Sequence, residues 1–116
     1  MTNATVDLEM IPAIIKEARE AAYIAADKFF NEKLGGEDQM ACGFAWVNIW
    51  GVKMNTKLGK AFKAAGLDKD YAGAISIWNP SGINVQNVDV KEAGAEAAAD
   101  VFTKYGFTAY AGSRLD

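Results

Sequence analysis

The chain has 116 residues, of which 51% are hydrophobic and 23% are charged, and its net charge is −3. This length and composition predict one globular domain, residues 1–116, with a single core. The absence of histidine removes the commonest general base, the usual nucleophile pairs and most zinc sites. We therefore expect no catalytic residue, no metal ion and no cofactor, and the sequence favours a protein that is not an enzyme.

Charge and hydropathy patterns argue against further classes of function. Basic and acidic residues alternate without a basic block, so the main source of nucleic-acid affinity is missing. No segment reaches the roughly 18 apolar residues of a membrane span, and the polar, acidic N-terminus differs from a signal peptide. The single cysteine, Cys42, lies in an apolar run and is expected to be buried, in a reducing compartment. We expect a cytoplasmic protein without membrane or nucleic-acid partners.

The first predicted element is a long amphipathic helix over residues 8–34. Asp7 is a candidate N-cap and Gly35-Gly36 is a plausible stop. Pro12 either lies in the first turn, so that the helix starts near Met10, or it kinks the helix. The apolar positions at spacings of three and four are Leu8, Ile11, Ile15, Ala18, Ala22, Ala25 and Phe29.

Residues 41–50 alternate as a β-strand with two largely apolar sides. The slimmer side carries Gly43, Ala45, Val47 and Ile49, and the bulkier side carries Cys42, Phe44, Trp46, Asn48 and Trp50. A short helix is predicted over residues 56–65, capped by Asn55 or Thr56 and ended by Gly66. Its lysines are expected to point into solvent.

A β-hairpin is predicted over residues 72–90. Its first strand covers residues 72–78, and Asn79-Pro80-Ser81-Gly82 has the residue preferences of a type I turn. Residues 83–88 alternate as the return strand, which places the amides of Asn84 and Gln86 on its wet face. This turn chemistry accounts for the polar residues of the segment without a ligand.

The last two elements are a helix over residues 89–105, capped by Asp89, and a strand over residues 107–113. Gly94 costs helix stability, so we expect it to be explained by close packing against a neighbouring backbone. The order of elements predicts an α+β two-layer sandwich. Two main helices and a short helix would pack on a four-stranded, mainly antiparallel sheet.

The alanine-rich helices fit the slimmer side of this sheet, so the other side should carry aromatic residues with a few polar groups. The candidate ligand or interface residues on it are Phe44, Trp46, Asn48, Trp50, Ser76, Trp78, Tyr110 and Arg114. Two helices cannot cover both faces, and an open aromatic face exceeds the apolar patch of a typical monomer. Three interpretations stay open: an interface between subunits, a ligand pocket, or a core covered by the short helix and the 50–56 loop.

The segments SIWNPSGINVQN and GFTAYAGSRLD resemble small uncharacterised proteins of marine bacteriophages and ocean metagenomes. The resemblance implies a cytoplasmic role in an infected bacterium, and it carries over no functional residue. Our main hypothesis is a non-enzymatic protein that self-associates or binds a partner through the aromatic side, with a host protein as a further candidate partner. The alternative is a small-molecule binding protein or weak enzyme, in which Arg114 holds an anionic metabolite and Tyr110 or Asp116 assists proton transfer.

Overall fold

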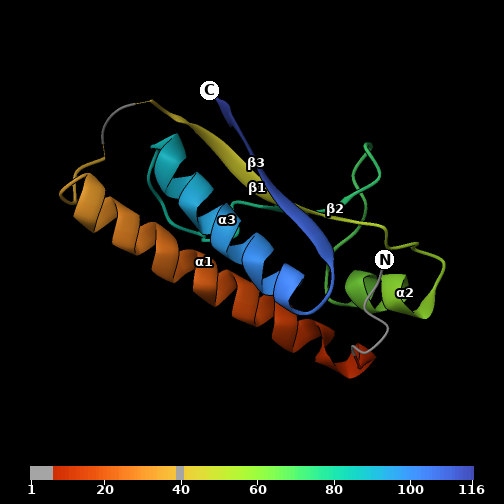
Figure 1. Ribbon diagram of the computed structural model, residues 1–116. Coiled ribbons are helices and arrows are strands. Elements are labelled where there is room, and N and C mark those ends of the chain that lie inside the picture. Colours follow the sequence, from red (N-terminus) through yellow and green to blue (C-terminus); the bar gives the residue numbers. More distant parts are fainter. Residues whose placement is uncertain (1–6, 39–40) are drawn as a thin grey trace.

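Two long helices lie side by side against one face of a β-sheet in the computed structural model, which describes residues 7–38 and 41–116 (Figure 1). The elements in chain order are a short 3₁₀ helix η1 (Leu8–Met10), α1 (Ile11–Lys33), β1 (Gly43–Trp50), α2 (Lys57–Ala64), β2 (Ile75–Trp78), α3 (Val88–Lys104) and β3 (Thr108–Leu115). The architecture is α+β as predicted, but the described sheet has three strands instead of four.

The start of α1 follows from its proline. Asp7 accepts a hydrogen bond from the backbone N–H of Glu9 and caps η1. Pro12 then lies in the first turn of α1, where a missing N–H costs nothing, so this helix starts at Ile11 without needing a kink at the proline. The buried residues of α1 are Ile11, Ile14, Ile15, Ala18, Ala22 and Ala26. Ala25 and Phe29, which were expected to face inward, lie only partly buried beside this stripe.

Small residues bring α1 and α3 close together. A Cβ atom added at Gly94 of α3 would lie 3.0 Å from the carbonyl oxygen of Ala22 in α1 and 2.9 Å from the Cβ of Ser81. A side chain at this position would therefore push the two helices apart. The prediction that close packing explains Gly94 is confirmed.

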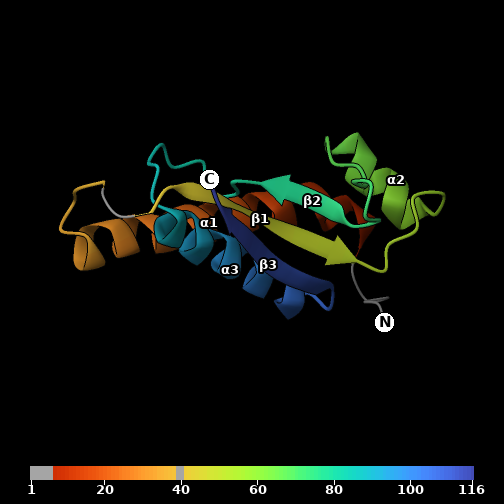
Figure 2. The same ribbon diagram turned by 90° about the horizontal axis from the view of Figure 1, so that it is seen from above.

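The sheet has the strand order β2-β1-β3, and both strand pairs are antiparallel. Its helix-facing side is buried and includes Ala45, Val47, Ile49, Ile75, Ile77 and Ala109. Figure 2 shows the strands in front of α1 and α3, with no helix lying over them. All the helical cover of this sheet is on one side.

The short helix α2 packs beyond one end of the sheet and leaves its outer face open (Figures 1 and 2). Its backbone lies close to η1 and α1. Its buried Phe62 meets Phe107 edge to face, with ring centroids 5.5 Å apart, and so closes the end of the core. The interpretation in which α2 covers the aromatic residues is therefore wrong.

The predicted return strand of the hairpin does not form. The turn is present, because the N–H of Gly82 donates to the carbonyl of Asn79 at 3.0 Å. The next segment is held elsewhere: the carboxylate of Asp38 accepts hydrogen bonds from the backbone N–H groups of Gln86 and Asn87, at 2.8 and 3.1 Å. The carbonyl of Gln86 accepts from the first residue of β1. These bonds direct residues 83–87 to the start of β1 and away from β2.

Two other predictions at the start of β1 and α3 are also wrong. The cap of α3 is Asn87, whose Oδ1 accepts from the N–H of Val90 at 3.0 Å, and not Asp89. The thiol residue Cys42 is exposed. It directly precedes β1 at the end of the sheet, where its carbonyl accepts from the N–H of Asp116.

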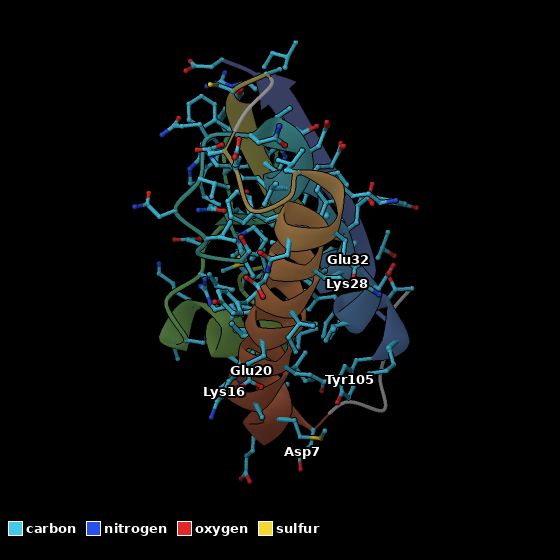
Figure 3. The ribbon with its side chains drawn as sticks, turned by 90° about the vertical axis from the view of Figure 1, so that its left-hand side faces the viewer. Asp7, Lys16, Glu20, Lys28, Glu32 and Tyr105 are labelled. Atoms are coloured by element: carbon cyan, nitrogen blue, oxygen red, sulfur yellow. The ribbon has the colours of Figure 1, made fainter. Side chains whose placement is uncertain are left out.

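A polar contact joins α1 to the end of α3. The hydroxyl of Tyr105 donates to Oε1 of Glu17 at 2.6 Å, and Lys104 pairs with the same carboxylate. Figure 3 shows Tyr105 on one side of α1, with Lys16 and Glu20 on the other. The hydrogen bonds from Lys104 and then Tyr105 hold the pKa of Glu17 below its ordinary value of 4.5.

Because the folded pKa of Glu17 lies below its unfolded value, this contact stabilises the fold above pH 4.5 and is lost as the pH falls through the folded pKa. We expect Glu17→Gln to be less stable than the wild type at neutral pH and to approach it in acid. Urea unfolding across this pH range measures the difference. The control is Glu20→Gln, which alters an exposed residue of the same helix; a Glu17→Gln difference that stays constant with pH would contradict the assignment.

Candidate functional site

The side of the sheet that faces away from the helices brings all the candidate residues together. Trp46 of β1 lies opposite Trp78 of β2, and Asn48 lies between Ser76 and Tyr110. Phe44 lies opposite Arg114 in the same register. We call this surface the aromatic face; its residues are Phe44, Trp46, Asn48, Trp50, Ser76, Trp78, Tyr110 and Arg114.

Much of the aromatic face is open to solvent. The exposed fraction is 54% for Trp78, 65% for Tyr110 and 37% for Trp50. Phe44 and Trp46 are half-buried, and they are shielded by neighbours on the face itself. The described parts of the chain therefore leave a contiguous aromatic surface uncovered.

The tryptophans are ordered by their neighbours. The indoles of Trp46 and Trp78 are stacked, with an interplanar angle of 4° and centroids 5.7 Å apart, and Phe44 lies 5.3 Å from Trp78. Trp46 lies flat over Gly112 of β3, since a Cβ at that glycine would be 2.5 Å from its Nε1. Parallel offset rings are a favourable arrangement. The face is thus pre-organised, and binding there costs little side-chain entropy.

Two cations lie beside the ring of Phe44. Lys91 of α3 donates from Nζ to the carbonyl of Gly43 at 2.9 Å, and the same Nζ lies 5.3 Å from the ring centroid. The guanidinium carbon of Arg114 lies 5.5 Å from this centroid. None of the described carboxylates forms a salt bridge with Arg114, so its donors remain available to an incoming anion or aromatic group. Lys91 was not among the site residues predicted from the sequence.

A groove of about 460 Å³ runs over the middle of the aromatic face. The loop at residues 70–72 forms one side of it. Its lining residues are Trp46, Asn48, Asp70, Tyr71, Ala72, Ser76, Trp78 and Arg114.

The loop at residues 70–72 was missed by the sequence analysis. Oδ1 of Asp70 accepts hydrogen bonds from the N–H groups of Ala72 and Ala74, at 2.9 and 3.1 Å, and holds the loop in a turn. An aspartate followed by Gly73 is a readable turn signal. Nothing in the sequence, however, places this turn beside β1.

One polar atom on the aromatic face lacks a partner. Oδ1 of Asn48 is buried and accepts no hydrogen bond from the described part of the chain. A buried acceptor without a donor costs about 1–3 kcal/mol. Asn48 lines the groove, but its Oδ1 is shielded from solvent, so the unpartnered oxygen is a cost of the fold and not an accessible contact for a ligand.

A larger hollow, of about 680 Å³, lies along the outside of α1 and offers less chemistry. Most of its lining comes from this one helix, where Lys16 and Glu20 project from the same side, one turn apart (Figure 3). Ser81 also lines it, but its hydroxyl already donates to Asn79 and accepts from Ile83. The groove on the aromatic face is the better candidate site.

The groove can bind through indole, amide, hydroxyl, carboxylate and guanidinium groups. Over residues 7–38 and 41–116, no group of three or more His, Cys, Asp or Glu side chains could hold a metal ion. Within the same residues, no helix is both long and apolar enough to cross a membrane.

In comparisons with known proteins, the chain matches no family model, no curated protein and no solved structure.

Replacing Asn48 by valine should stabilise the free protein. The change removes the unpartnered oxygen and introduces a residue that strands favour. We expect the free energy of unfolding to rise by about 1 kcal/mol, measured by urea denaturation. The control is Ser76→Val at the position directly opposite, where only the strand preference changes. If Asn48→Val stabilises no more than the control, Oδ1 of Asn48 carries no penalty.

Proposed function

We propose that the protein acts by binding, and that it self-associates through the aromatic face. The observation that carries this proposal is the ordered, solvent-exposed aromatic cluster around Trp46 and Trp78 on a sheet whose other side is already packed. Single exposed apolar residues are normal, whereas a contiguous aromatic patch is typical of an interaction surface.

The composition of the aromatic face suits a protein partner. Arg114 is the only charged residue among its members, and tryptophan, tyrosine and phenylalanine predominate. Aromatic residues and arginine are enriched in the centres of protein interfaces, whereas lysine and acidic residues are depleted. A second copy of the chain presents the same aromatic rings and the same guanidinium, which are mutually attractive groups.

Self-association predicts a mass above the 12.5 kDa of one chain at micromolar concentration. Tyr110→Ala should weaken it by about tenfold, because a buried interface tyrosine commonly contributes more than 1 kcal/mol. Tyr23→Ala is the matched control: Tyr23 is 51% exposed, close to the 65% of Tyr110, but lies on α1. Sedimentation velocity over a concentration series measures both variants. A wild-type monomer whose tryptophan emission is that of solvent-exposed indole would refute the proposal.

The groove favours a second candidate function, the binding of an aromatic anion. Among the described residues that line it, Arg114 is the cation and Asp70 the carboxylate, and Oδ1 of Asp70 is already bonded to two backbone N–H groups. Stacked indoles bind planar apolar groups, and an arginine binds carboxylate or phosphate. A planar anion would use both features.

Thermal-shift titration with aromatic carboxylates and phosphates tests this second function. We expect at least one of these compounds to stabilise the wild type. Its affinity for Arg114→Ala should fall at least about tenfold, because hydrogen bonds to charged groups contribute about 1.5–3 kcal/mol. Arg19→Ala is the control for loss of a positive charge, since Arg19 is exposed on α1. No shift with any compound would eliminate this function.

A further inference from the structure

The outer edge of β3 carries unpaired backbone groups. The N–H of Asp116 donates to the carbonyl of Cys42, and the β1–β3 register continues from this pair. Paired residues of an antiparallel ladder alternate between exchanging hydrogen bonds with each other and pointing outward. The even-numbered residues of β3 therefore bond to β1, and the odd-numbered residues present their N–H and C=O groups to the free edge. These outward residues are Ala109, Ala111, Ser113 and Leu115.

The opposite edge of the sheet is shorter and is covered at its start, which distinguishes it from the β3 edge. The β2 strand covers only Ile75–Trp78, and the 69–74 loop folds back along its start. Asp70 there donates its N–H to the carbonyl of Ala74 at 2.8 Å and accepts from the N–H of Ala74. Over the described residues, no comparable hydrogen bond reaches the outward backbone groups of β3. Proteins normally shorten or cover an edge strand, because a long bare edge pairs with other chains.

We propose that β3 pairs antiparallel with β3 of a second copy, about a two-fold axis at Gly112. This register is the one that uses every outward backbone group: Ala109 faces Leu115 of the second copy, and Ala111 faces its Ser113. The side chains of Ala109, Ala111 and Ser113 are small, so they do not obstruct the approach. The inference rests on the proposed self-association and places the contact between the two copies at the β3 edge, where Tyr110 and Arg114 are the residues of the aromatic face that take part.

The same register matches side chains on the aromatic face. Gly112 lies opposite Gly112 of the second copy, which leaves room at the axis for the indole that lies over each glycine. Tyr110 lies opposite Arg114 of the second copy, twice by symmetry. Such directly opposed side chains are in contact across antiparallel strands, and a guanidinium over a phenol ring is a favourable pair. Both residues are exposed in the single chain.

The resulting dimer is closed. Two three-stranded sheets join into one continuous sheet, whose two outer edges are the short β2 strands, so pairing does not continue easily at the sheet edges. Both sets of helices lie on one side of it, and both aromatic faces lie on the other. α3 packs against both β1 and β3, so the two α3 helices lie next to each other on the helix side of the joined sheet.

Two independent changes test the edge. Ala111→Pro removes an N–H group that points toward the second copy. It removes no N–H group that bonds to β1, and proline is tolerated on edge strands, so the single chain should still fold.

Tyr110→Arg places a guanidinium opposite Arg114 of the second copy and should raise the dimer dissociation constant about tenfold or more. Adding Arg114→Glu to Tyr110→Arg creates an opposite-charge pair across the axis and should restore the dimer. Sedimentation velocity measures mass, and circular dichroism reports whether each variant is folded.

We expect the wild type at twice 12.5 kDa, a folded monomer for Ala111→Pro, and a dimer that Tyr110→Arg weakens and the double variant recovers. A dimeric wild type with unchanged variants would overturn the β3 edge and leave self-association standing. A double variant that dimerises as weakly as Tyr110→Arg alone would also overturn the β3 edge. If Ala111→Pro fails to fold, the comparison of Tyr110→Arg with the double variant decides whether the edge is used. A monomeric wild type would overturn both the edge and the proposed function.

Discussion

The contact of α1 with α3 at Gly94 is the constraint on which the rest of this structure depends. Without a side chain there, the backbone of α3 reaches the carbonyl of Ala22 in α1, and both helices fit over a three-stranded sheet. Buried alanines on both helices keep the two backbones close along the rest of their contact. Because both long helices are used on one side of the sheet, the other side has no helical cover (Figure 2).

The open side is therefore shaped by its own side chains. Trp46 lies on Gly112 and stacks with Trp78, so the rings order one another without a second layer. This arrangement leaves one buried oxygen, on Asn48, without a donor. A contiguous apolar surface that is open to water is costly in a monomer, and burying it on binding recovers that cost. Edge pairing uses Tyr110 and Arg114, and groove binding uses Arg114 with the indoles, so the two share this guanidinium.

The predictable parts of this fold are those with a local periodic signal. The alternation of β1 separated Ala45, Val47 and Ile49 from Trp46 and Asn48, and the structure buries the first group. The capping residue Thr56 and the turn at Asn79 were also readable, because their hydrogen bonds join residues close in sequence. The candidate residues of the aromatic face came from this alternation, extended to strands whose register was unknown.

The wrong predictions have long-range causes. The alternating segment 83–88 has the pattern of a strand, but Asp38, almost fifty positions earlier in the chain, takes its backbone N–H groups. Tertiary contacts of this kind override local strand preference. The predicted set of site residues was incomplete for the same reason. The Asp70 turn lies beside β1 only because β2 packs there.

By itself, the sequence determined the approximate positions of the three α-helices and of the three strands that form, where Gly94 demands close packing, and which side of β1 is aromatic. These follow from periods of 3.6 and 2 residues and from local hydrogen bonds. Only the tertiary structure decided that the sheet has three strands, that α2 leaves the aromatic face open, and that the β3 edge is bare. Strand number, cover and edges depend on which distant groups take up the backbone hydrogen bonds, and that choice is made by the whole chain at once.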